Sequence, residues 1–153
     1  MPQATAGILL YRRPDSGPEV LLVHMGGPFW ANKDAGAWSI PKGLLEPSED
    51  AATAARREFG EETGGAAPDD LAPLGDFRLS GNKVLTVFAA EGAFDPAEFR
   101  SNSFTMEWPP KSGRMAEFPE ADRAGWFALA EAAAKITAGQ RPILEALAAL
   151  LAG

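Results

Sequence analysis

GLLEPSEDAATAARREFGEETGG, residues 43–65, holds the clearest helix of the chain and its densest group of acidic side chains. A helix is expected over residues 48–63, because Ser48 can cap the first turn and Gly64 can end the last. Glu49 and Asp50 suit the positive end of the helix dipole. The Ala-rich interior, poor in β-branched residues, supports the same assignment.

Three carboxylates of this helix are spaced i, i+3 and i+4, so they project from one side: Glu58, Glu61 and Glu62. A separate apolar stripe is expected from Ala52, Ala55 and Phe59. Like charges packed this closely raise one another's pKa and cost stability unless a cation lies between them. Arg57 supplies part of that charge, and a hard divalent cation such as Mg²⁺ would supply the rest. On this spacing alone, a solvated acidic helix face is the better explanation.

Short apolar runs before the helix predict a pair of buried strands. They cover residues 4–11 and 20–25, with the turn-forming sequence PDSGP between them. The apolar residues are nearly continuous rather than alternating, which favours a sheet covered by helices on both faces. A second hairpin is expected from residues 76–80 and 83–89, because Gly81-Asn82 suits a tight turn.

The C-terminal stretch from residue 128 onward is rich in Ala and Leu, and Gly139 and Pro142 predict a break between two helices. One face of the last helix is expected to carry Ile143, Leu147 and Leu150. Strands on both sides of one helix, followed by closing helices, predict an α/β domain of α/β/α sandwich type. A chain of 153 residues predicts a single domain, 1–153.

Composition excludes several classes of site. The net charge of −7 argues against general nucleic-acid binding. With no Cys, disulfides, zinc–thiolate sites and thiol nucleophiles are excluded, and the single His24 cannot form a multi-histidine site and is expected to be structural. No run approaches the roughly 20 apolar residues of a membrane span, and the first residues carry their charges after the apolar run, unlike a signal peptide. A cytoplasmic protein without membrane contact is expected.

The motif around the helix has fixed identities at fixed spacing. Five residues separate Gly43 from Glu49, and seven separate Glu49 from Arg57-Glu58. An apolar residue, a free position, Glu61-Glu62, a free position and Gly64 follow. This pattern resembles the signature of the Nudix hydrolases, whose fold is a mixed sheet between helices. It departs at the final position, where Gly65 replaces an aliphatic residue, so packing at the helix exit is in question.

The resemblance implies metal-dependent hydrolysis of a diphosphate bond in a nucleoside diphosphate linked to another group, with Mg²⁺ or Mn²⁺ as cofactor. It implies metal ligands at the Gly43 carbonyl and at three side chains: Glu58, Glu61 and Glu62. By the same resemblance Glu58 is a candidate proton acceptor. Arg57 would hold a glutamate in position, and Glu49 would support the site.

Loop residues are the candidates for substrate binding. Lys42, before the motif, could meet a phosphate, and so could Lys111 and Arg114 in the loop WPPKSGR. Family members often take a general base from a late loop, so Glu117 and Glu120 are further catalytic candidates. Two exposed rings could stack on a base: Phe29 and Trp30. For each residue of the late loop, an ordinary surface charge is the alternative, and Trp126 and Phe127 are expected in the core.

The group attached to the diphosphate is not read from the motif, because variable loops bind it. A dinucleoside polyphosphate ranks narrowly first, followed by nucleoside triphosphates including oxidised ones, nucleotide sugars and diphosphoinositol polyphosphates. A small-molecule nucleotide or polyphosphate is thus the expected partner, with the protein a monomer or homodimer. The alternative function is a catalytically silent Nudix-fold domain that binds nucleotide and regulates a partner. All motif glutamates are present, which favours the enzyme.

Overall fold

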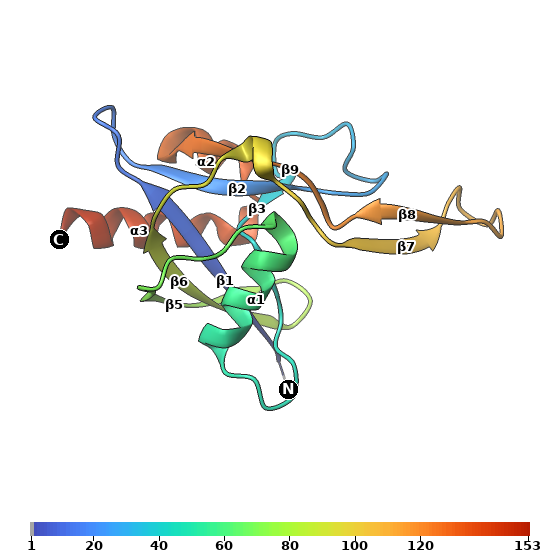
Figure 1. Ribbon diagram of the computed structural model, residues 1–153, viewed down its shortest axis with the longest axis horizontal. Helices are drawn as coiled ribbons and strands as arrows, with labels where there is room; N and C mark the ends of the chain where they lie inside the picture. Colours follow the sequence, from blue (N-terminus) through green and yellow to red (C-terminus); the bar gives the residue numbers. More distant parts are fainter. Residues whose placement is uncertain (1) are drawn as a thin grey trace.

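The computed structural model describes residues 2–153 as a seven-stranded mixed sheet, a separate two-stranded hairpin and helices on both faces of the sheet (Figure 1). The first half of the chain contains β1 (Gln3–Arg12), β2 (Glu19–Met25), β3 (Trp38–Ser39), β4 (Lys42–Leu44), α1 (Ala51–Thr63), β5 (Ala72–Leu79) and β6 (Lys83–Glu91). The second half contains η1 (Pro96–Glu98), β7 (Ser103–Glu107), β8 (Met115–Pro119), β9 (Ala121–Ala128), α2 (Leu129–Lys135), η2 (Ala138–Gln140) and α3 (Arg141–Ala152).

Both faces of the central strands are buried, which explains their continuous apolar runs. On β1, Ala6, Ile8 and Leu10 pack with α1, whereas Leu9 faces the opposite cluster. That opposite cluster includes buried residues of α2 and α3. Side chains alternate along a strand, so a strand covered on both sides is apolar at most of its positions. The expected α/β/α sandwich is therefore confirmed. The expected hairpin of residues 76–89 is formed by β5 and β6, whereas the first expected strand pair is joined only next to its turn.

The sheet changes partners along β1. Antiparallel pairing with β2 is confined to Tyr11 and Arg12, whereas the first half of β1 pairs with β4 from Thr5 to Gly7. On its other side β1 runs parallel to β6 over its whole matched length. Because β4 takes the place that β2 leaves, the Lys42-Gly43 segment lies in the sheet and next to α1. This divergence of β2 from β1 positions the site described below.

The hairpin of β7 and β8 lies apart from the main sheet. Figure 1 shows it extending from the body of the molecule beyond β9. Its strands pair from Ser103↔Pro119 to Glu107↔Met115, and their exposed and half-buried residues alternate. The sequence did not predict this hairpin. Its tip is the loop of residues 108–114, so the cations of that loop lie at the end of a projection.

The start of α1 corrects one expectation. Ser48 adopts a left-handed φ of 66°, which a helix N-cap does not have. Asp50 is the N-cap instead, in extended conformation, and its Oδ1 accepts a 2.8 Å hydrogen bond from the Thr53 amide. The side chain of Glu49 is thereby left to contact other residues. The predicted end at Thr63 and the left-handed C-cap at Gly64 are confirmed.

Two helix faces also differ from expectation. In α1 the buried face is centred on Ala55 and includes Ala54, so Ala52 is only half-buried. In α3 the buried residues are Ile143, Leu144 and Leu147, and the face continues with Leu151, so Leu150 is 44% exposed. In both helices the buried face is rotated slightly about the helix axis from the expected one. Several Ala and Leu residues lie close to that face, so the sequence pattern did not decide which of them are buried. Trp126 and Phe127 pack against the core as expected. Within residues 2–153, no helix combines the length and apolar character needed to cross a bilayer.

Candidate active site

The face of α1 that carries the glutamates forms one wall of a cavity of about 460 Å³. The opposite walls come from β4, the loop after it, and two residues far along the chain, Asn102 and Glu120. The acidic residues that line it are Glu46, Glu58, Glu61, Glu62 and Glu120. Lys42 and Arg57 are the cations of the lining. The structure therefore brings Glu120 close to the motif glutamates. A catalytic acid from a late loop would have to lie in this position.

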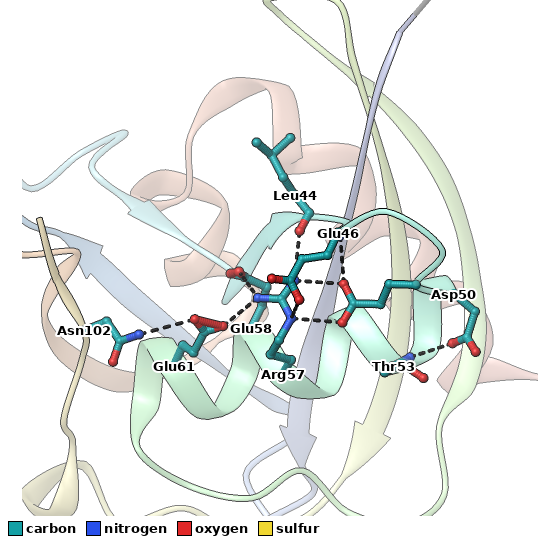
Figure 2. A network of polar contacts seen from close by, with 9 residues as sticks. Leu44, Glu46, Asp50, Thr53, Arg57, Glu58, Glu61 and Asn102 are labelled. Carbon is teal, nitrogen blue, oxygen red and sulfur yellow. Dashed lines mark hydrogen bonds and ion pairs between the residues drawn. The ribbon is translucent and has the colours of Figure 1, made fainter.

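Arg57 connects the acidic residues at the mouth of the cavity (Figure 2). Its Nη1 donates to Glu58 Oε1 at 2.9 Å and to Glu61 Oε2 at 2.6 Å. On the other side Nε and Nη2 donate to the two carboxylate oxygens of Glu49, both at 2.9 Å. Such a fork is geometry that guanidinium provides and an ammonium does not. One side chain thus holds a glutamate of the loop before α1 and two glutamates of α1 itself.

The supporting glutamate is itself well anchored. Glu49 Oε1 accepts from the Glu46 amide at 2.9 Å, and Arg57 Nη2 also donates to the Leu44 carbonyl at 2.9 Å. The hydrogen bonds from Arg57 lower the pKa of Glu49 to about 2, with the Glu46 amide contributing. Conversely, Glu49 is the main reason that the pKa of Arg57 is raised. The loop before α1 is thereby tied to the middle of the helix.

For two glutamates that line the cavity, Glu58 and Glu62, the pKa is raised rather than lowered. Burial is the main cause that raises the pKa of Glu62, to about 8, and the charges of Glu58 and Glu120 add to the effect. Lys42 opposes it through its charge and a backbone hydrogen bond. Burial likewise raises the pKa of Glu58, against the opposing hydrogen bond from Arg57. The inner carboxylates therefore lie where a nearby positive charge would be strongly stabilising.

Gly43 is required by close approach to α1. A Cβ atom built on Gly43 would overlap the carboxylate of Glu58, so no other residue fits without moving that carboxylate. The glycine is held in β4 opposite Ala6 of β1, which leaves its backbone next to the glutamates. This contact explains in physical terms why the motif begins with glycine.

The donor set fits a hard divalent cation. Carboxylate oxygens from Glu58, Glu61, Glu62 and Glu120 line one cavity, and such oxygens are the ligands that Mg²⁺ and Mn²⁺ prefer. Over residues 2–153, no group of three or more His, Cys, Asp or Glu side chains lies arranged so that it could hold a metal ion. Glu58 and Glu61 are instead bonded to Arg57. Ions of this kind usually keep several waters and complete their shell with substrate phosphates.

Comparison with protein families gives one match over most of the chain: the model described as NUDIX domain matches residues 1–147. The chain belongs to the Nudix family. The expectation drawn from the spacing of residues 43–65 is thereby confirmed.

Solved structures share the Nudix fold at low sequence identity. An Ap4A hydrolase of C. elegans, in a binary complex, is 22% identical over 97% of this chain and 98% of its own, with a TM-score of 0.70. The NUDIX domain of Shewanella oneidensis NrtR, complexed with ADP ribose, is 17% identical over 99% and 89%, with a TM-score of 0.66. A MutT protein from Methanosarcina mazei Go1 is 20% identical over 99% and 96%, with a TM-score of 0.61. No curated protein matches the sequence.

Two further cavities adjoin the acidic one in this Nudix domain and share Lys42 with it. The first, of about 270 Å³, is lined by Trp30, Lys42, Glu62 and Glu120 among others. The second, of about 430 Å³, is lined by Trp30, Lys42, Lys83 and residues of η2. Lys42 therefore lies where all three cavities meet. Of the predicted base-stacking rings, Trp30 lines both of the further cavities.

Other predicted loop residues lie elsewhere. Phe29 is 59% exposed and contacts the Trp108 ring edge-on, with centroids 5.4 Å apart. Glu117 is exposed on β8, and Lys111 and Arg114 are exposed in the hairpin tip. None of these four residues is among those that line the three cavities within residues 2–153. The local sequence of residues 108–120 did not reveal that Glu117 lies on a projecting hairpin, whereas Glu120 lies just after its second strand and lines the cavity.

Sequence reasoning missed two residues of the site. Asn102 Nδ2 donates to Glu61 Oε1 at 3.3 Å, and its carbonyl accepts from the Glu120 amide at 2.7 Å. Glu46 Oε1 lies 3.4 Å from Arg57 Nε. No local signal marks Asn102, because it lies 41 residues from its partner. Glu46 occupies a free position of the motif and could have been found only as an acid near Arg57.

The departure at Gly65 has a structural explanation. A Cβ atom on Gly65 would lie 2.9 Å from Phe94 Cε1, so the aromatic ring already occupies the space of the usual aliphatic side chain. Phe94 packs against the α1 cluster and lies edge-on to Phe59, with centroids 6.5 Å apart. The helix exit is therefore filled from a distant segment.

Proposed function

We propose that this Nudix domain is a divalent-metal-dependent pyrophosphohydrolase, acting in the cytoplasm on a small nucleotide and not on nucleic acid. The observation that carries the proposal is the convergence of Glu58, Glu61, Glu62 and Glu120 on one cavity beside Gly43 and Lys42. A diphosphate brought to such a wall would be repelled without cations, and Mg²⁺ or Mn²⁺ is the class of ion the donors fit. The intact glutamates favour turnover over a silent regulatory domain.

The bound ions would neutralise phosphate oxygens and lower the pKa of a water ligand toward neutrality. Glu58, Glu61 and Glu62, with the Gly43 carbonyl, would hold them, and the fork of Arg57 keeps Glu58 and Glu61 oriented. Lys42 would meet a phosphate as a point charge. Either Glu58 or Glu120 would accept the proton of the attacking water, and both line the cavity.

For the substrate we propose a dinucleoside polyphosphate first, or a nucleoside triphosphate including oxidised forms. The adjoining cavities favour a ligand that continues beyond the hydrolysed diphosphate, because Trp30 offers an aromatic wall and Lys83 a second cation. The similar C. elegans protein is described as an Ap4A hydrolase, which agrees with this order.

The test is a panel assay with Mg²⁺ or Mn²⁺, in which the products of dinucleoside polyphosphates, nucleoside triphosphates, ADP ribose, nucleotide sugars and diphosphoinositol polyphosphates are separated by chromatography. Glu61→Gln and Glu62→Gln are expected to lower kcat by about 10² or more, since each removes a metal-binding charge. Glu145→Gln, an exposed helix glutamate on α3, is the matched control and is expected to retain full activity.

Unchanged turnover in both motif variants would contradict the proposal. If no compound is cleaved but nucleotides bind with micromolar affinity, the regulatory function takes precedence.

A further inference from the structure

The loop of residues 26–36, which carries Trp30, is fixed at its middle by a buried histidine. His24 lies on β2 with no exposed surface. Its Nδ1 lies 2.9 Å from Asp122 Oδ1 and 3.1 Å from Asp122 Oδ2. Its Nε2 lies 2.6 Å from the carbonyl oxygen of Lys33 in the loop. Both ring nitrogens therefore have partners, as expected of a structural histidine.

These two partners constrain the protonation of the ring. A carboxylate and a carbonyl oxygen only accept hydrogen bonds, and a neutral imidazole carries a single N–H. Both contacts form together if the ring is an imidazolium or if Asp122 carries the proton. In either case Nε2 carries the N–H that is donated to the Lys33 carbonyl, because a carbonyl oxygen only accepts. Hydrogen-bond geometry thus assigns the donor role at Nε2 to His24.

A local irregularity in β9 places the carboxylate at the ring. In the pairing of β2 with β9, His24 lies opposite Arg123 and Met25 lies opposite Ala121, so Asp122 is an extra residue without a partner position. A β-bulge of this kind re-aims a side chain that regular pleating would send elsewhere. Asp122 also lies two residues after Glu120, so the same segment contributes to both features.

The charged groups around His24 tie further atoms of the loop. The Trp38 ring lies edge-on to His24 at 5.2 Å, and its Nε1 donates to Asp34 Oδ1 at 2.8 Å. Lys135 of α2 donates to Asp34 Oδ2 at 2.6 Å. The guanidinium of Arg123 lies 5.1 Å from the Trp38 ring centroid. Two successive loop residues, Lys33 and Asp34, are therefore held from β2, β3 and α2.

The connection from His24 to the cavity is short. The Lys33 amide donates to the Trp30 carbonyl at 3.0 Å, and the Lys33 ammonium lies 5.3 Å from the Trp30 ring centroid. Trp30 in turn lines both cavities that adjoin the acidic site. Moving the Lys33 carbonyl away from His24 would move the backbone that presents the Trp30 ring.

We propose that His24 is a positioning residue, whose buried Nε2–H holds the Lys33 carbonyl and thereby places the Trp30 ring at the wall of the substrate cavity. The consequence for substrate rests on the proposed function. The hydrogen bond from His24 and the fixing of the loop do not, because they follow from the contacts of the metal-free protein.

The chain contains one histidine, so its ring can be observed without assignment ambiguity. In protein labelled with ¹⁵N-histidine, Nε2 is expected to carry a proton at pH 7. Asp122→Asn is the matched variant: its amide can donate to Nδ1, so Nε2 is expected to keep its proton. An Nε2 without a proton in the wild-type protein would overturn the proposal.

Two substitutions separate the two contacts. The amide nitrogen of His24→Gln can take the place of Nε2 and donate to Lys33, whereas that of His24→Asn can take only the place of Nδ1. Amide hydrogen exchange in residues 26–36 is expected to rise about tenfold in His24→Asn and to stay near wild type in His24→Gln, as loss of one hydrogen bond predicts. Equal exchange in wild type and both variants would overturn the proposal.

Turnover adds a third readout once a substrate is identified. His24→Asn is expected to raise KM about tenfold with kcat nearly retained, whereas a general loss of folding would lower the active fraction and hence kcat. A fall in kcat with KM unchanged would overturn the positioning role. If the panel yields no substrate, the spectrum of the ring and the exchange of the loop still test His24, so the two proposals fail separately.

Discussion

The acidic cavity and the cavity of about 430 Å³ beside it share Lys42, but the charged residues that line them have opposite sign. Five glutamates line the first, whereas the second is lined by Lys42, Lys83 and Trp30 with no acidic residue among its described lining. Although the chain has a net charge of −7, the charged residues that line this second cavity are both lysines. The first cavity suits cations and a diphosphate, and the second suits an anionic or aromatic group that extends from it. In the proposed function, hydrolysis and recognition of the attached group would therefore take place in two different cavities.

The two cavities also differ in how the chain builds them. Most of the acidic wall comes from one continuous segment, residues 42–62, with only Asn102 and Glu120 added from afar. The second cavity takes residues from four separate segments, near residues 25–30, 39–42, 79–83 and 137–140. A local pattern can therefore reveal the first cavity, whereas only the folded sheet assembles the second.

Substitution of two glutamates, Glu117 and Glu120, tests whether the acidic cavity or the hairpin of β7 and β8 contributes to catalysis. Glu120 lines the acidic cavity, whereas Glu117 is exposed on β8. If Glu120 accepts the proton or supports the ions, Glu120→Gln is expected to lower kcat by about 10²–10⁴, and Glu117→Gln to leave it unchanged. Steady-state kinetics with the best substrate of the panel measures both. The reverse ranking would place the hairpin, rather than this cavity, next to the reacting bond.

Trp30 tests the recognition side. Trp30→Ala is expected to raise KM roughly ten- to hundredfold for substrates with a base, because stacking on one ring contributes about 1–3 kcal/mol. Phe29→Ala is the matched control, since that ring is exposed and points to Trp108 rather than to a cavity. Kinetics with and without the base, for example with inorganic polyphosphate, gives the comparison. Equal KM changes in both variants would mean that the second cavity does not bind the base.

The raised pKa of Glu62 can be tested by the pH dependence of the protein's stability. Its raised pKa means that the folded state keeps a proton that the unfolded state loses, so its contribution to stability falls as pH rises from about 4.5 to about 8. Metal-free Glu62→Gln is therefore expected to gain stability relative to wild type between pH 5 and 8. Mg²⁺ should raise the Tm of wild type more than that of the variant.

Thermal unfolding at both pH values, with and without Mg²⁺, measures these shifts. A Tm difference between variant and wild type that does not change with pH would show that Glu62 is ionised in the folded protein at pH 5.

The smallest expected effect lies on α1 outside the site. Gly60→Ala should stabilise the protein by about 1 kcal/mol, because a Cβ there would meet only the Gly65 carbonyl at an ordinary 3.6 Å. Gly64→Ala is the control and should destabilise, since Gly64 has a φ of 81° and its Cβ would lie 2.9 Å from Arg100 Cβ. Urea unfolding measures both. A destabilised Gly60→Ala would show that the acidic face depends on flexibility at this position.

Local patterns in the sequence are enough to predict the sandwich, the helix and the motif glutamates. Spacing along one helix fixes which side chains share a face, and burial on both faces makes most positions of β1 and β2 apolar. The same reasoning placed the N-cap at Ser48 rather than Asp50, because either residue type caps a helix and only the backbone conformation decides between them.

The contacts between distant segments of the chain come from the folded sheet and could not be predicted from local patterns. The divergence of β2 from β1 set Lys42 where three cavities join, and the hairpin of β7 and β8 moved Lys111, Arg114 and Glu117 away while returning Glu120. Phe94 replaced an aliphatic residue at position 65, and a bulge aimed Asp122 at His24. Each of these contacts joins residues far apart in sequence, and their proximity depends on strand pairing and register, which no local spacing encodes.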